Sequence, residues 1–224
     1  DSFYSEEALV DTLVQGKLVS QLVRTLPSVP GSPKSLKAEG SGTGKSVQLN
    51  YEQPDSNGAA ILEYEVLTYS SAGTLLITSN TTATSFLVAN LQYNTSYSFT
   101  IRARNRKGWG PDAIKTASTQ ALRCDTPAMQ RVANSDITET TLAVSWLKPV
   151  EERGSPVLSY YLEVKLAGVQ FANFTLPPSD TSKLIPQLAP FTEYTVRVKA
   201  VTADSNFDSF YSEEALVDTL VQGK

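Results

Sequence analysis

Short segments in which apolar and polar residues alternate are the strongest constraint on what this chain can fold into. In Val47–Tyr51 and in Leu142–Trp146, every second residue is apolar. A period of two puts these side chains on one face of a strand, whereas an amphipathic helix would need a spacing of three or four. Both segments are therefore predicted to be half-buried antiparallel strands.

Clusters of turn-forming residues separate these segments from further strands. Such clusters of Asp, Asn, Ser, Gly and Pro occupy residues 55–58, 71–73 and 107–111. Strands are predicted between them at residues 61–69, 74–78, 85–88 and 97–104. Many short strands with regular turn signals indicate an all-β sandwich.

Two internal repeats organise the chain. Asp1–Lys17 recurs unchanged as Asp208–Lys224, an offset of 207 residues, so the chain is interpreted as one period plus the opening of the next, cut from a longer array. Within that period, Leu91–Ala103 parallels Leu188–Ala200 at an offset of 97 residues. Each of the smaller units is about the size of one sandwich domain.

The second unit carries a motif that makes the fold more specific. Leu188–Tyr194 matches the pattern Leu-x-Pro-x-Thr-x-Tyr that precedes the sixth strand of fibronectin type III domains, and the order of strands and turns in both units resembles that family. The resemblance implies tandem seven-stranded fibronectin type III-like (immunoglobulin-like) β-sandwiches. Residues 29–121 are expected to form one domain, and residues 122–224 a second domain with the start of the next linker.

The resemblance also implies structural roles for four aromatic residues. In the family, the corner tyrosine bonds the backbone through its hydroxyl, which would be the role of Tyr97 and Tyr194. Tyr51 and Trp146 end the corresponding second strands and are expected in the two cores. The first domain has Tyr51 where Trp is usual, but it keeps an aromatic ring.

The repeat at the amino end is interpreted as part of a neighbouring unit. Residues 1–16 are expected to be the last strand of a preceding repeat, followed by a linker over residues 17–28. Such a strand would be short of backbone partners, so we expect it to dock on another domain or subunit, forming head-to-tail oligomers by strand exchange. Four residues of the predicted linker are candidate contact residues, with stiffening of the array as the equal alternative: Leu18, Val19, Leu22 and Val23.

Composition excludes several function classes. The chain has no histidine, which removes histidine-based triads, dyads and zinc sites, and no catalytic, cofactor-binding or metal-binding residue is predicted. A net charge of −4 argues against nucleic-acid partners, and no apolar run suggests membrane insertion. The single cysteine, Cys124, is expected to be a small apolar residue near a domain junction, with an intermolecular disulfide as the alternative.

Two local patterns have a functional and a structural interpretation. Gly40–Ser46 resembles a phosphate-binding loop, but it leads into a predicted strand instead of a helix, so an ordinary loop is favoured. Trp109 lies in the loop before the last strand, where it could anchor a partner or fold over the sandwich edge, and the second is favoured.

Three tripeptides fit the rule for N-linked glycosylation, beginning at Asn80, Asn94 and Asn173. Asn80 and Asn94 are predicted in loops, where an acceptor is accessible. These sites favour an extracellular, secreted or cell-surface location.

The sequence thus predicts a non-catalytic structural or adhesive module, a spacer and interaction surface in an extracellular rod or fibre. Its partners would be copies of itself in the array and, in addition, other extracellular proteins. Two alternatives remain open: the ectodomain of a cell-adhesion molecule or receptor, and an accessory segment of a large secreted enzyme.

Overall fold

The chain divides into two compact units, which we describe separately as the first and second domains. The boundary lies between Gln120 and Ala121, one residue from the expected position. The computed structural model describes residues 7–14, 17–130, 132–133 and 137–220, and for residues 7–24 it describes the backbone only. The described part is all-β, with antiparallel strands and one short 3₁₀ turn at Ser205–Phe207.

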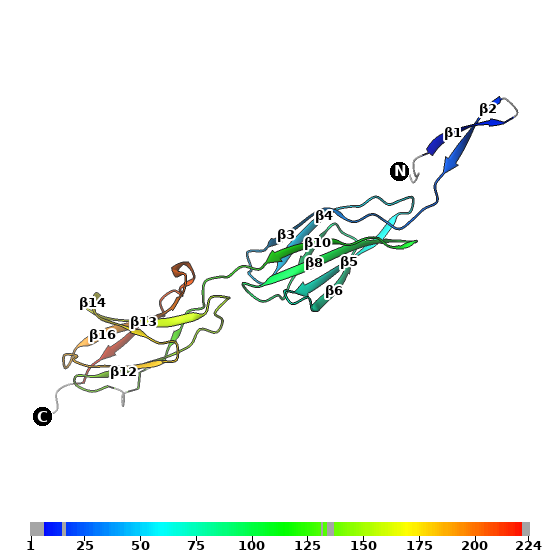
Figure 1. The fold of residues 1–224 in the computed structure, drawn as a ribbon. Coiled ribbons are helices and arrows are strands. Elements are labelled where there is room, and N and C mark those ends of the chain that lie inside the picture. The colour runs from blue at the N-terminus through cyan, green and yellow to red at the C-terminus, as the bar shows by residue number, and fades with distance from the viewer. Residues whose placement is uncertain (1–6, 15–16, 131, 134–136, 221–224) are drawn as a thin grey trace. The chain divides into compact units, whose positions relative to one another are not determined.

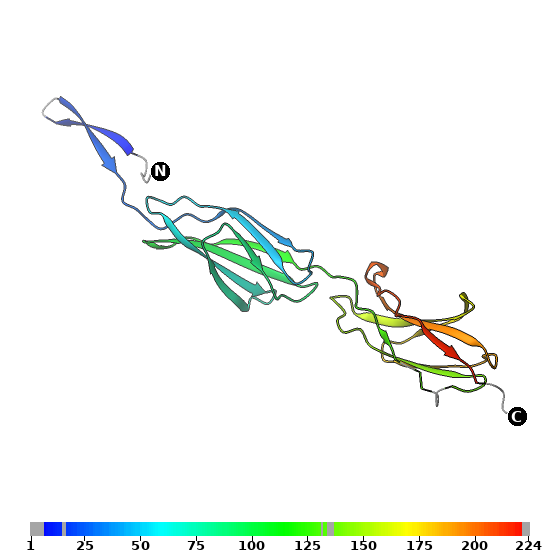
Figure 2. The same ribbon diagram turned by 180° about the vertical axis from the view of Figure 1, so that it is seen from behind.

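The first domain is a sandwich of two antiparallel sheets (Figures 1 and 2). A three-stranded sheet contains β3 (Lys34–Gly40), β4 (Val47–Glu52) and β7 (Ser85–Val88), in the order β3-β4-β7. The second sheet has the order β10-β8-β5-β6, and β9 pairs with β8. Its strands are β5 (Ile61–Ser70), β6 (Leu75–Thr81), β8 (Ser96–Asn105), β9 (Gly108–Trp109) and β10 (Ala113–Ser118).

The second domain repeats this arrangement. One sheet has the order β11-β12-β15, and the other has the order β14-β13-β16-β17. The strands are β11 (Ala128–Met129), β12 (Leu142–Leu147), β13 (Val157–Leu166), β14 (Val169–Leu176), β15 (Ser182–Ile185), β16 (Glu193–Thr202) and β17 (Ala215–Asp218). The predicted fold class is confirmed in both domains.

Each core forms where the alternating strands meet. Val47, Leu49 and Tyr51 on β4 are all buried, while the residues between them are at least partly exposed. The Tyr51 ring packs edge-on against Tyr64 of the opposite sheet, with ring centroids 5.0 Å apart, and its hydroxyl donates to the Ala83 carbonyl at 2.9 Å. Tyr51 therefore fills the space of the usual Trp and has a partner for its polar end.

The second core is built in the same way around Trp146. This side chain is 1% exposed and packs edge-on against Tyr160, with centroids 5.5 Å apart. Tyr160 lies on β13 of the facing sheet, so the aromatic pair joins the two layers. Truncating Trp146 would leave a cavity that costs about 3–5 kcal/mol.

Both corner tyrosines bond the backbone as the family resemblance implied. The amide of Gln92 donates to the Tyr97 hydroxyl at 3.0 Å, and the amide of Ala189 donates to the Tyr194 hydroxyl at 2.9 Å. In each domain this bond closes the turn five residues before the tyrosine. It holds the loop that crosses from one sheet to the other.

A threonine from the end of the domain secures each corner a second time. The Thr219 hydroxyl donates to the Ala189 carbonyl at 2.7 Å and accepts from the Thr192 amide at 2.9 Å. In the first domain, Thr119 bonds the Gln92 carbonyl and the Thr95 amide in the same way. The corner is thus tied to the last strand of its own domain.

The structure corrects the expectation for the amino-terminal segment. Residues 17–24 are not part of a linker, because they form strand β2 (Lys17–Arg24), which pairs antiparallel with β1 (Glu7–Val14). The backbone of residues 7–14 therefore has a partner within the same chain. The expectation that residues 7–14 need another domain as a pairing partner is therefore wrong.

Replacing Tyr194 with Phe removes the hydroxyl that accepts from the Ala189 amide. Since that amide lies in a closed corner, we expect the free energy of unfolding to fall by about 0.5–1.5 kcal/mol. Chemical denaturation measures this change. Tyr161→Phe, a change to a partly exposed tyrosine on β13, is the control and should leave stability nearly unchanged. Equal effects of the two changes would contradict the role of the corner bond.

Candidate functional site

The described residues contain no group of three or more Asp, Glu or Cys side chains that could hold a metal ion. The loop at residues 41–46 contains clustered hydroxyl groups, and Thr43 bonds Ser46 at 2.6 Å. This loop connects β3 to β4, so no helix amino terminus is available there to bind a phosphate. The surfaces of the two sandwiches are therefore the candidate sites.

Trp109 lies over arginines on the outward face of the first domain. On β9 it pairs with Arg104 of β8, and the guanidinium carbons of Arg102 and Arg104 are 4.9 Å and 5.6 Å from its ring centroid. Both are within cation–π range. The partly buried ring thus folds over the sheet, as the favoured interpretation expected.

Two glutamates hold these arginines from the neighbouring strand. Arg102 binds Glu65 at 2.6 Å, and Arg104 binds Glu63 at 2.7 Å, both across from β5. This part of the surface therefore consists of two neutralised ion pairs with an aromatic cover. Such pairs favour structural stiffening over attraction of an anionic partner.

The second domain has a comparable cluster around Tyr211. The Arg197 guanidinium lies 3.9 Å from the Tyr211 ring centroid, and the Lys199 ammonium lies 5.8 Å from it. Glu163, which is 7% exposed, forms an ion pair with Arg197. Burial, followed by the charge of Glu163, raises the pKa of the Tyr211 phenol.

A further ion pair extends this cluster to the start of the last strand. Lys165 donates to Glu214 at 2.8 Å and thereby lowers the pKa of the Glu214 carboxyl. Lys199 binds Asp208 at 3.1 Å. Sequence reasoning missed Tyr211 as an aromatic cover because no Gly-Trp-Gly signal marks it. The signal available in the sequence was the position of Tyr211 on the segment that follows β16, where Arg197 and Lys199 alternate with apolar residues.

The three predicted glycosylation sites are all exposed. Asn94 lies in the corner loop before β8 and has a positive φ of 47°. Asn80, however, lies within β6 and not in a loop, and its amide donates to Glu63 at 3.3 Å. Asn173 lies on β14, which has only β13 as a neighbour in its sheet. Asn80 and Asn173 are thus accessible on edge strands, and Asn94 is accessible in a loop.

The other contact candidates are placed by their backbone alone. Leu18, Val19, Leu22 and Val23 are on β2, opposite Leu13, Thr12, Leu9 and Ala8 of β1. Their side chains lie outside what the structure describes. Their role in a subunit contact stays a prediction.

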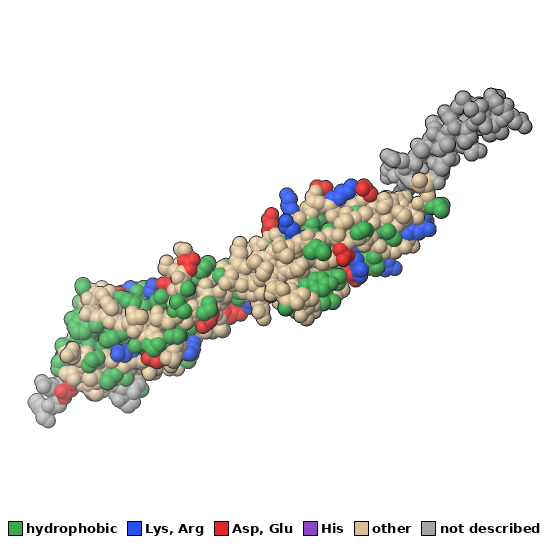
Figure 3. Space-filling view, viewed as in Figure 1, with side chains coloured by type: hydrophobic (Ala, Val, Ile, Leu, Met, Phe, Trp, Pro, Cys, Tyr) green, Lys and Arg blue, Asp and Glu red, His purple; other side chains and the backbone are tan. Residues whose placement is uncertain are grey.

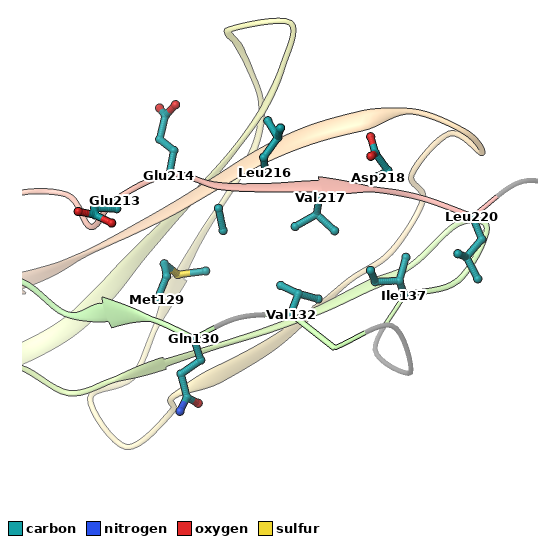
Figure 4. Close-up of a pocket in the computed structure, with 11 residues that line it drawn as sticks. Met129, Gln130, Val132, Ile137, Glu213, Glu214, Leu216, Val217, Asp218 and Leu220 are labelled. Carbon is teal, nitrogen blue, oxygen red and sulfur yellow. The ribbon is translucent and has the colours of Figure 1, made fainter.

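A groove runs along the outer edge of β17 in the second domain (Figure 4). Its volume is about 780 Å³. Figure 4 shows Val217 and Leu220 on one side of it and Val132 and Ile137 on the other, with Met129 near one end. Three acidic residues, Glu213, Glu214 and Asp218, also line it. The groove beside β17 thus has a mixed lining of apolar and acidic residues.

The family comparison agrees with the two sandwiches. The model of the fibronectin type III domain matches residues 31–119 and 126–214, well over half of the chain. The chain belongs to the fibronectin type III family.

Among curated proteins, similar fibronectin type III relatives are the sidekick proteins. Protein sidekick-2 of Gallus gallus is 30% identical over 213 residues, which cover 90% of this chain and 10% of the relative. Protein sidekick-1 of Homo sapiens is 28% identical over 209 residues, which cover 89% of this chain and 9% of the relative. The chain therefore spans about a tenth of the length of these relatives.

Among solved structures, a two-domain fibronectin type III segment of chicken tenascin is similar at 21% identity, with a TM-score of 0.45. The match covers 84% of this chain and 99% of the tenascin segment. In the part of this chain that the structure describes, no helix has the length and apolar character needed to cross a bilayer.

Cys124 is a core residue of the second fibronectin type III domain. It is 3% exposed, and its thiol lies 3.4 Å from the Asp125 carbonyl. Burial, followed by the charges of Glu152 and Asp125, raises the pKa of the thiol to about 11. The geometry favours the expected role as a small apolar residue over an intermolecular disulfide.

We expect Cys124 to react slowly with thiol reagents in the folded protein. With a pKa of about 11 instead of about 9, the thiolate fraction at pH 8 falls roughly a hundredfold. Labelling at pH 8 in buffer and in denaturant measures the ratio, and the unfolded chain provides the reference. Rapid labelling of the folded chain would contradict the burial of this thiol.

The pKa of Cys124 is higher in the folded chain than in the unfolded chain, so the free energy of unfolding depends on pH. The neutral thiol contributes stability below about pH 9, and this contribution is lost as the pH rises toward 11. Cys124→Ala should therefore flatten the stability profile in that window. Unfolding curves between pH 8 and pH 11 for both chains test this, and parallel profiles would contradict it.

Proposed function

We propose that this chain is part of the extracellular region of a cell-adhesion molecule related to the sidekick proteins. The observation that carries the proposal is the match to sidekick-2, which extends over 90% of the chain. Because that match spans both fibronectin type III domains, the similarity extends over the tandem pair and not over the fold of a single domain. The two domains would act as spacers that place other parts of the molecule at a distance from the cell surface.

The surfaces of the two domains support a role as spacers. In both, the outward face of the sheet that contains β8 or β16 carries charged groups already paired within the same domain. Aromatic rings cover these pairs at Trp109 and Tyr211. Charged side chains that already form ion pairs gain less free energy from a new charged partner. This outward face therefore favours a rigid domain over tight binding of a partner.

A structural role in a repetitive rod is the second candidate, and the exact sequence repeat favours it. Recurrence of Asp1–Lys17 at an offset of 207 residues is the pattern expected of an array of near-identical units. In that case copies of the chain, joined head to tail, would be its main partners. Function would come from length and repetition more than from the affinity of one contact.

Antibody labelling of the source cells tests the extracellular proposal. Antibodies raised against the folded 224-residue chain should label intact cells, because the two domains would face the medium. Labelling that requires permeabilised cells would overturn the proposal. Beads coated with the chain test the adhesive part separately: binding no greater than that of uncoated beads would favour the spacer role over direct adhesion.

On secretion from a eukaryotic cell, we expect Asn80, Asn94 and Asn173 to carry N-linked glycans, with Asn94 the most fully occupied because it lies in a loop. Intact mass before and after enzymatic deglycosylation measures occupancy. Asn94→Gln should remove one glycan and leave the fold intact. Asn57→Gln, in a sequence without the acceptor pattern, is the control and should leave the glycan mass unchanged. An unshifted mass would contradict the extracellular location.

A further inference from the structure

Each sheet of the two sandwiches ends in edge strands, whose unpaired backbone groups can accept a strand from another molecule. Four of the edge strands that the structure describes contain charged residues, which oppose such pairing: β3, β10, β15 and β17. Three others have four residues or fewer: β7, β9 and β11. These edges are therefore protected by charge or by their short length.

The outer strands β6 and β14 lack both kinds of protection. Among the described strands, β6 pairs only with β5 and has the sequence Leu-Leu-Ile-Thr-Ser-Asn-Thr. β14 pairs only with β13 and has the sequence Val-Gln-Phe-Ala-Asn-Phe-Thr-Leu. Neither strand contains a charged residue or a proline. Uncharged segments of this length, rich in β-branched or aromatic residues, are prone to edge-to-edge association.

Both unprotected strands carry an acceptor sequence for N-linked glycosylation at an exposed asparagine. Asn80 of β6 stands opposite Glu65 of β5, and Asn173 of β14 stands opposite Glu163 of β13. Each of these glutamates forms an ion pair with an arginine on the outward face of its sheet. Because residues directly opposite in an antiparallel pair share one face, both asparagines lie on the outward face.

The acceptor asparagines lie in the regular part of each edge strand. In both ladders the register shifts near the hairpin turn, and a bulge of this kind hinders further pairing only where it occurs. Residues 77–81 of β6 and 172–176 of β14 pair without interruption. These regular stretches are open to a new strand, and each of them contains the acceptor asparagine.

Each of the two strands also exposes large apolar side chains. Leu75 and Leu76 on β6 are both 50% exposed, while Val169 and Phe171 on β14 are 70% and 45% exposed. Figure 3 shows hydrophobic side chains at the surface of both domains. An exposed apolar edge strand is a site of association unless a further group covers it.

We propose that N-linked glycans at Asn80 and Asn173 protect these two edges, so that the chain does not pair edge to edge with a second copy of itself. A glycan is bulky and hydrophilic, and at these positions it takes the place of the charged residues on the other edges. The inference rests on the proposed extracellular location, because this modification takes place on secreted and cell-surface chains.

The chemistry of the modification is compatible with the contacts of these side chains. The asparagine amide nitrogen bonds to the anomeric carbon of an oligosaccharide, and the bond from that carbon to the diphosphate of a lipid-linked donor breaks. The amide nitrogen gives up one proton and keeps one. Asn80 can therefore still donate its remaining hydrogen to Glu63, as it does in the structure.

The third acceptor, Asn94, provides an internal comparison. It lies in the corner loop before β8 and not on a strand. A glycan at Asn94 therefore covers no sheet edge. We expect its removal to leave the association of the chain unchanged.

Variants of the full chain, secreted from eukaryotic cells, test the proposal. Replacing both edge acceptors, Asn80→Gln with Asn173→Gln, should shift the molar mass in light scattering from monomer to dimer and larger as the protein concentration rises. The unchanged chain and Asn94→Gln should stay monomeric over the same range. A double variant that stays monomeric, or equal association of Asn94→Gln, would overturn the proposal.

A second variant separates edge pairing from misfolding. Thr78→Lys and Thr175→Lys add a charge to the outward face of β6 and β14, and they should return the double variant to a monomer. These lysines also move the net charge of −4 toward zero, so general repulsion between molecules does not account for a return to the monomer. Continued association of the variant with lysines would overturn the proposal.

Intact mass separates this inference from the proposed function. Glycans present on Asn80 and Asn173, together with a monomeric double variant, would overturn the protection of the edges and leave the extracellular location standing. Absence of glycans from the secreted chain would overturn both.

Discussion

The corner between the two sheets fixes the position of every later strand in each domain. In the second domain, the Tyr194 hydroxyl accepts from the Ala189 amide while the Thr219 hydroxyl binds both the Ala189 carbonyl and the Thr192 amide. These bonds set where β16 begins. Because β16 pairs with β13 on one side and β17 on the other, its starting point determines the register of the whole sheet.

The outward face follows from this register. With β16 in place, Arg197 stands opposite Glu163, and the chain that leads into β17 brings Tyr211 over both Arg197 and Lys199. A slip by one residue would turn Arg197 toward the core and Val198 toward solvent. A polar corner at the start of β16 therefore controls which charged groups can meet.

The fold was largely predictable because its signals are local. Alternation in Val47–Tyr51 and the motif at Leu188–Tyr194 each specify a strand or a corner without reference to distant residues. The pairing of β1 with β2 was not predicted, because consecutive Leu-Val pairs do not alternate and resemble an apolar linker. Asn80 was assigned to a loop because Ser, Asn and Thr around it resemble a turn, yet pairing with β5 extends β6 through it. The ion pairs of Arg102 and Arg104 with Glu65 and Glu63 were also not predicted, since they join strands β8 and β5, which are far apart in the sequence.

The dissimilarity of the two domains has a consequence for refolding. Their corner sequences match only in part, whereas the strand that completes the second domain is copied without change at an offset of 207 residues. The two copies of that strand sequence are thus 207 residues apart along this chain. Each doubling of that separation adds roughly 0.6 kcal/mol to the entropic cost of closing the wrong loop. This separation therefore helps the Tyr194 corner to bind the strand of its own domain when the chain refolds.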